Sequence, residues 1–142
     1  MAAIVIGALL ALSGCVVASP DADTYGDATA STLGTAASEV ATVKTLLTLL
    51  DSHKIPRPAV VTQLRYSEEN LAKASQGFGS LNPPPEHDEL ERRAGRLLDD
   101  AGSLLQGARV AVHRHDTAEY AGIADDLEAL AQQLQDLETS AS

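Results

Sequence analysis

The sequence predicts an all-α protein whose main part is an antiparallel, up-down-up-down four-helix bundle. Three observations lead to this prediction. Apolar residues recur every three or four positions in four separate segments, which is the spacing that places side chains on one face of an α-helix. Stretches rich in proline and glycine separate these segments. Aromatic residues make up 3% of the chain and Trp is absent, so the core must be built from Leu, Val, Ile and Ala.

The first two predicted helices cover about residues 28–52 and 58–78. Steps of three and four mark the buried face of the first helix, which carries Leu33, Ala36, Val40, Val43, Leu47 and Leu50. The same steps in the second helix include a serine, and the face reads Val60, Leu64, Ser67, Leu71, Ala74 and Phe78. Between them, Ile55-Pro56-Arg57-Pro58 is expected to end one helix and start the next, because a first turn tolerates proline and a helix interior does not.

The third and fourth predicted helices cover about residues 85–113 and 116–138. The third carries Leu90, Ala94, Leu97, Ala101, Leu104, Ala108 and Ala111, with Leu98, Leu105 and Val112 widening the face. The fourth carries Tyr120, Ile123, Leu127, Leu130, Leu134 and Leu137. The 77–85 segment, rich in Gly and Pro, separates the second helix from the third. Asp116-Thr117-Ala118-Glu119 has the pattern of a capping box and is expected to open the fourth helix.

Matched helix lengths and short connections favour the up-down-up-down arrangement. The alternative is a three-helix arrangement with the first helix loosely docked. Antiparallel pairing of the third and fourth helices places Gly107 opposite Gly122, which predicts a close approach of the two backbones there. The same pairing puts the arginines of the third helix beside acids and an amide of the fourth, namely Arg92, Arg93 and Arg96 beside Gln133, Asp136 and Glu138.

The chain is 142 residues long with a formal charge of -10. One domain of ordinary size fits this length. A strongly acidic surface repels phosphate backbones, so nucleic acid is not an expected partner. The chain has 1 cysteine, which excludes an intramolecular disulfide.

That cysteine follows an apolar run at the N-terminus. Residues 2–12 would span about 16 Å as a helix, roughly half the thickness of a bilayer core. The run is therefore too short for a transmembrane helix and suits the apolar region of a signal peptide. It ends in Leu12-Ser13-Gly14-Cys15, and the small residues at 13 and 14 would let the chain enter a peptidase cleft.

This segment resembles the lipobox of bacterial lipoproteins, and with the Ala-rich helical remainder it resembles small lipoproteins of high-GC Gram-positive bacteria. The resemblance implies that residues 1–14 are a signal peptide and that Cys15 is lipidated with diacylglycerol and acyl chains such as palmitate. It also implies attachment to the extracytoplasmic face of the cell membrane. The sequence predicts that residues 15–27 form a flexible tether and that residues 28–142 form the bundle. Beyond this covalent lipid no cofactor is expected.

In the predicted topology, the links at 52–57 and 113–115 share the end of the bundle that faces away from the membrane. This end is the candidate binding site, formed by His53, Arg57, His113, Arg114, His115 and Asp116, with Asp51 and Lys54 beside them. Three interpretations remain open. Imidazoles with a carboxylate suit Zn, Cu or Ni, although His113 and His115 would not share a helix face and no metal ligand is assigned. A basic end could dock an anionic partner, or the cations could simply stabilise helix C-termini.

No catalytic residues are predicted, because no nucleophile, base or phosphate loop stands in a recognisable context. The sequence therefore favours a non-enzymatic, lipid-anchored cell-envelope protein that acts as an interaction or accessory module. Its expected partners are the membrane, through the lipid, and an envelope protein; the oligomeric state is left open. The alternative function is a metal- or small-ligand-binding module that uses the His and Arg cluster at the membrane-distal end.

Overall fold

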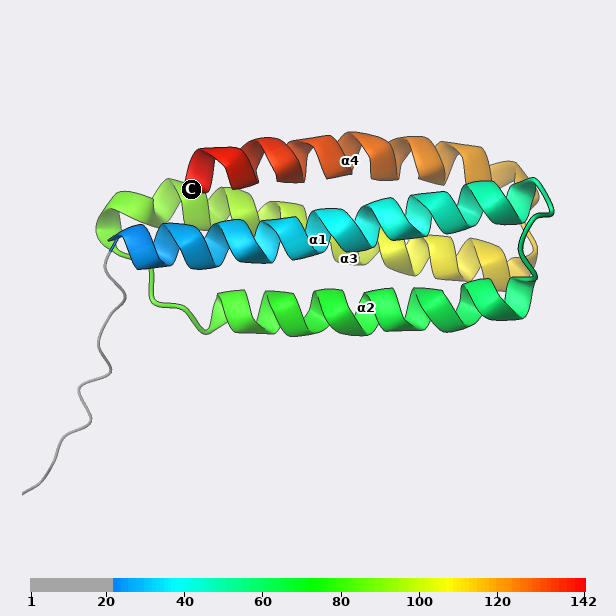
Figure 1. Ribbon diagram of the computed structural model, residues 1–142, viewed down its shortest axis with the longest axis horizontal. Helices are drawn as coiled ribbons and strands as arrows, with labels where there is room; N and C mark the ends of the chain where they lie inside the picture. The colour runs from blue at the N-terminus through cyan, green and yellow to red at the C-terminus, as the bar shows by residue number, and fades with distance from the viewer. Residues whose placement is uncertain (1–21) are drawn as a thin grey trace, which may run out of the picture.

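The computed structural model describes residues 22–142, which are all-helical and contain no strand. Four α-helices account for nearly all of this region: α1 (Ala22–Asp51), α2 (Arg57–Gly79), α3 (Asp88–Arg114) and α4 (Tyr120–Ala141). Two short 3-10 helices, η1 (Pro85–His87) and η2 (Thr117–Glu119), precede α3 and α4. The helices lie side by side along one long axis, as Figure 1 shows. The prediction of four packed helices is therefore confirmed.

Helix α1 is the central element of the packing. It packs most closely against α4, and it also contacts α2 and, across the bundle, α3. Helix α3 in turn packs on both α2 and α4. The first turn of α1 and the C-terminus lie at one end of the molecule, and the link from α1 to α2 lies at the other (Figure 1). The first helix is thus not loosely docked, and the three-helix alternative is wrong.

The start of α1 corrects the predicted tether. Residues 22–27 were expected to belong to a flexible segment, but α1 begins at Ala22 and Tyr25 is 1% exposed. The ring of Tyr25 lies 5.4 Å from that of His87 and 6.5 Å from that of Phe78. The buried face continues through Thr29 to Leu33 at helical spacing, but glycine and threonine interrupt its apolar pattern. The earlier part of the predicted tether lies outside the described residues, as do residues 1–14 and Cys15.

The close approach of helices also falls elsewhere than predicted. A Cβ added at Gly107 or Gly122 would meet nothing within 4 Å, so these glycines do not face each other across a tight contact. Instead, a Cβ at Gly26 would lie 2.6 Å from the carbonyl oxygen of Ala141. One at Gly34 would lie 2.7 Å from a carboxylate oxygen of Glu138. The carboxylate of Glu138 is the end of a flexible side chain and could move away, so it is the missing side chain of Gly26 that lets the end of α4 come close to α1.

The predicted core is largely confirmed. Leu33, Val40, Leu47, Leu64 and Leu134 are 0% exposed. In α3 the face is rotated slightly from the prediction, because the residues expected to widen it are the more deeply buried: Leu98, Leu105 and Val112. Leu97 and Leu104 are only half-buried against the core. One polar side chain in this core, Ser67 of α2, is 0% exposed and its hydroxyl has no hydrogen-bond partner.

The starts of α3 and α4 differ from the prediction by a short 3-10 turn each. Helix α3 begins at Asp88 rather than 85 because the residues after Pro84 first form η1. Helix α4 begins at Tyr120 rather than 116, and it continues past 138 to Ala141. The capping box at Asp116 is wrong, since the Asp116 side chain makes no capping hydrogen bond. Its backbone N–H instead donates to the carbonyl of Ala111, and this hydrogen bond is part of the C-terminal cap of α3.

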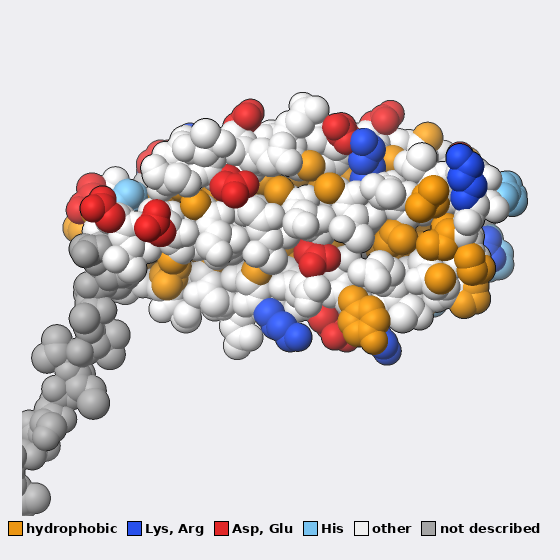
Figure 2. Space-filling view, viewed as in Figure 1, with side chains coloured by type: hydrophobic (Ala, Val, Ile, Leu, Met, Phe, Trp, Pro, Cys, Tyr) orange, Lys and Arg blue, Asp and Glu red, His pale blue; other side chains and the backbone are white. Residues whose placement is uncertain are grey.

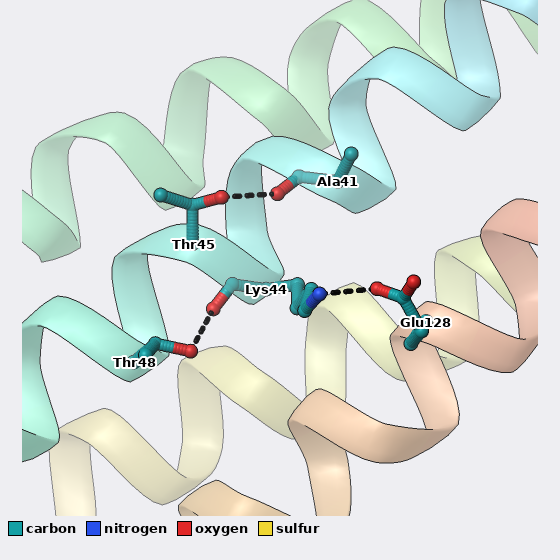
Figure 3. Close-up of polar contacts among 5 residues, drawn as sticks. All are labelled: Ala41, Lys44, Thr45, Thr48 and Glu128. Carbon is teal, nitrogen blue, oxygen red and sulfur yellow. Dashed lines mark hydrogen bonds and ion pairs between the residues drawn. The ribbon is translucent and has the colours of Figure 1, made fainter.

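A polar contact on the surface joins α1 to α4, and further hydrogen bonds lie within α1. Lys44 of α1 forms an ion pair with Glu128 of α4, and the hydroxyls of Thr45 and Thr48 donate to carbonyls one turn earlier in α1 (Figure 3). The hydrogen bond and charge of Lys44 hold the pKa of Glu128 below its usual value. Exposed pairs of this kind contribute about 0–1 kcal/mol each, so they set register more than stability.

A groove between α3 and α4 brings together some of the residues that were predicted to be neighbours. Arg93 and Arg96 line it together with Gln133 and Asp136. Arg92, in contrast, pairs with Glu89 of its own helix. Among residues 22–142, no helix combines the length and apolarity needed to cross a membrane.

The glycines give a test of the packing. We expect Gly107→Ala to raise the free energy of unfolding by up to about 1 kcal/mol, because Ala is the better helix former and the position is open. Gly26→Ala should lose this gain, since its Cβ would collide with backbone of α4. Urea unfolding followed by circular dichroism measures both. Equal stabilisation by the two substitutions would contradict the close contact between α1 and α4.

The buried hydroxyl of Ser67 gives a second test. Ser67→Ala should raise the free energy of unfolding by about 1 kcal/mol or more, because it removes a buried polar group without a partner and improves helix propensity. Ser103→Ala, at an exposed position of α3, changes propensity alone and serves as the control. Thermal or urea unfolding measures the change in free energy of unfolding for each variant. The difference between the two changes is the energetic cost of burying the Ser67 hydroxyl without a partner. A destabilised Ser67→Ala would show that the hydroxyl has a partner.

Candidate functional site

The candidate site lies at the end of the bundle where the 52–56 link meets the start of α4. A groove of about 530 Å³ opens there. Hydrophobic side chains gather at the right-hand end of Figure 2, next to Lys, Arg and His side chains. The groove is lined by Leu50, Asp51, His53, Lys54, Ile55, Pro56, Arg57, Thr117 and Tyr120.

Two histidines at this end adopt a left-handed backbone conformation. The φ angle of His53 is 57° and that of His115 is 61°, and no other non-glycine residue described has a positive φ. This conformation disfavours residues with a Cβ and costs roughly 1–2 kcal/mol. Glycine is the usual residue at such a position. Strained backbone of this kind tends to cluster at functional sites, and here both instances lie at one end of the molecule.

Both histidines occupy the position that ends a helix. After α1, the N–H of His53 donates to the carbonyl of Leu50, and the N–H of Lys54 donates to that of Leu49. After α3, His115 and Asp116 donate in the same pattern to Val112 and Ala111. Each pair of bonds is a Schellman motif, which satisfies the last carbonyls of a helix. The backbone of each histidine is thus fixed by its helix, and each side chain stands at the edge of the link.

Arg57 is the first residue of α2 and is half-buried. Its Nη1 lies 2.9 Å from both ring nitrogens of His115. Its Nε is buried and has no hydrogen-bond partner. The residue before it, Pro56, provides no side-chain cap, and the first turn of α2 carries no acidic residue. The positive end of this helix dipole is therefore not offset within α2 itself.

Tyr120, the first residue of α4, is the most deeply buried polar residue of the groove. It is 1% exposed, yet its hydroxyl has no hydrogen-bond partner. Buried tyrosines usually find a partner for this group. The sequence pattern placed Tyr120 in the core face of the fourth helix but did not mark it as part of the site. A tyrosine at the first apolar position after the 113–115 turn is the signal that could have revealed it.

The predicted site residues do not all come together. His53 and Arg57 line the groove, and His115 contacts Arg57. His113 and Arg114 lie exposed in the last turn of α3 and do not line it. Asp116 is half-buried and its backbone helps to end α3. Lys54 and Asp51, noted beside the cluster, do line the groove.

The metal-binding hypothesis finds no ligand set in this part of the chain. Within residues 22–142, no group of three or more His, Cys, Asp or Glu side chains is arranged to hold a metal ion. The groove instead combines an arginine, a lysine and a histidine with one aspartate and an apolar wall. This combination suits an organic anion better than a cation.

Comparisons with protein-family models, with curated proteins and with solved structures find no match to this chain.

The backbone strain at His53 can be tested directly. We expect His53→Gly to raise the free energy of unfolding by up to about 1 kcal/mol, because glycine adopts the left-handed conformation without strain. His113→Gly is the matched control: its backbone is helical, and glycine there should lower stability by a few tenths of a kcal/mol. Urea unfolding of both variants would measure the difference. A loss of stability in both would contradict the strained helix end.

Proposed function

We propose that this chain is a lipid-anchored protein of the bacterial cell envelope, attached to the membrane through Cys15, and that it acts through contacts with other molecules rather than by catalysis. The observation that carries the proposal is the Leu12-Ser13-Gly14-Cys15 segment placed directly after an apolar run of signal-peptide length. The single cysteine of the chain, Cys15, lies at the position where a lipobox has its cysteine.

The short stretch of sequence between Cys15 and α1 supports attachment of the bundle close to the membrane. Helix α1 begins at Ala22, so residues 16–21 separate it from the proposed lipid. Even fully extended, this segment would span no more than about 25 Å. The first turn of α1 would therefore lie near the membrane surface. Helix α1 has 30 residues and a length of about 45 Å, so the groove at its other end would face outward.

The proposal takes the helices to alternate in direction, up-down-up-down. Contacts between distant segments support this connectivity. At one end, Tyr25 of α1 meets Phe78, which stands near the end of α2, and His87, just before α3. At the other end, Arg57 of α2 meets His115, just after α3.

The charge distribution supports a partner other than nucleic acid. The net charge is -10, and the outer face of α4 carries exposed acids, among them Asp125, Asp126, Glu128 and Asp136. Such a surface repels phosphate backbones. We propose an envelope protein as the partner of the outer surface and the lipid bilayer as the partner of the anchor.

Lipid attachment is tested by metabolic labelling with an alkyne fatty acid in a bacterial host that processes lipoproteins. We expect the full-length chain to incorporate the label and to sediment with membranes. Cys15→Ser should lose both properties, because no other thiol is available to form the thioether. Ser13→Ala, which keeps a small residue before the cysteine, is the control and should be labelled. An unlabelled wild type, or an equally labelled Cys15→Ser, would overturn the proposal.

A further inference from the structure

We propose that the groove between the 52–57 link and the start of α4 binds a small organic anion through a phosphate or carboxylate group. The guanidinium of Arg57 and the hydroxyl of Tyr120 would hold the anionic group, and the organic part would lie against the apolar wall. The inference does not depend on lipid attachment at Cys15.

The unpartnered polar atoms of the groove carry the argument. Two residues that line it each hold a buried group without a hydrogen-bond partner, Nε of Arg57 and the hydroxyl of Tyr120. Buried donors are almost always satisfied by protein, water or ligand. Both groups can donate a hydrogen bond, and both belong to side chains that line the groove, so we assign them as the donors to the oxygens of an oxyanion.

The charges around the groove favour an anion. Arg57 and Lys54 are cationic and His53 adds an imidazole, against the single carboxylate of Asp51. The N-terminus of α2 contributes the partial positive charge of a helix dipole, and its first turn has neither a side-chain cap nor an acid to offset it. Arginine can also form two parallel hydrogen bonds to a phosphate or carboxylate, which gives the contact direction as well as strength.

His115 acts as a positioning residue for Arg57. Its ring nitrogens lie 2.9 Å from Nη1 of the guanidinium, and a neutral imidazole nitrogen can accept a hydrogen bond there. Because the Schellman motif after α3 fixes the backbone of His115, the guanidinium is held at Nη1, while Nε has no protein partner. The strained conformation of His115 therefore helps to present the donor.

The size and lining of the groove indicate an organic ligand rather than a bare ion. Its volume of about 530 Å³ lies in the range of about 300–1,000 Å³ found for small-molecule sites. Leu50, Ile55 and Pro56 supply an apolar wall beside the charged residues. A ligand with an anionic group on an apolar body would contact both parts.

The test is a titration of the full-length chain in detergent micelles with phenyl phosphate, followed by calorimetry and by NMR of the backbone amides. We expect saturable binding, with the largest shifts at residues 53–57 and 117–120. Arg57→Gln should weaken the affinity at least about tenfold, and Tyr120→Phe about three- to tenfold, from the loss of a charged and a neutral hydrogen bond. Benzoate in place of phenyl phosphate distinguishes a carboxylate from a phosphate ligand, and either result supports the proposal.

Controls separate the groove from general charge and from unfolding. Arg114→Gln removes one positive charge at the same end without touching the groove, and it should leave the affinity unchanged. Arg57→Lys keeps the charge and should bind more weakly than wild type while retaining the helical circular dichroism spectrum. The proposal is overturned by the absence of saturable binding at millimolar ligand, by equal effects of Arg57→Gln and Arg114→Gln, or by equally tight binding of neutral benzyl alcohol.

Discussion

The burial of one face of α1 against the three other helices is the constraint on which the rest of the structure depends. Helix α1 contacts α4 most closely and also reaches α2 and α3, so its position fixes theirs. At the first turn of α1, the close contact with the end of α4 is possible because Gly26 has no side chain. Tyr25 anchors the first turn of α1 against Phe78 and His87. Because α1 is held at that end, the position of its other end is fixed as well. Leu50 and the residues just after α1, His53 and Lys54, therefore line the groove.

The fold could be predicted where apolar residues repeat without interruption. The helical spacing of Leu33, Val40 and Leu47 is enough to identify a buried face. The same reasoning missed the first two turns of α1, because glycine and threonine stand at buried positions between Tyr25 and Leu33. It also misplaced the close contact at Gly107 and Gly122, since glycine pairs on facing helices do not reveal which pair of helices approaches most closely.

The candidate site could be predicted in its place but not in its geometry. Links at one end of a bundle bring their residues together, so His53, Arg57 and His115 were expected to be neighbours. Whether a side chain points into a groove depends on how each helix ends. The residues that end α1 and α3 in a left-handed backbone conformation are His53 and His115. Glycine is the usual residue at such a position, so nothing in the sequence indicated this conformation. Tyr120 was assigned to the core from its helical spacing with Ile123 and Leu127, and its ring is indeed buried. Only the absence of a hydrogen-bond partner for its hydroxyl distinguishes it.

The arrangement of contacts also has a dynamic consequence for α2. This helix packs on α1 and α3 but not appreciably on α4, and its buried face includes the unpartnered Ser67. It is therefore the element best placed to separate locally while α1 and α4 stay together, in the manner of a subglobal opening. Arg57 begins this helix, so a molecule held by its guanidinium would have to leave before α2 could open. Occupancy of the groove would then slow amide exchange along α2, far beyond the residues that touch the ligand.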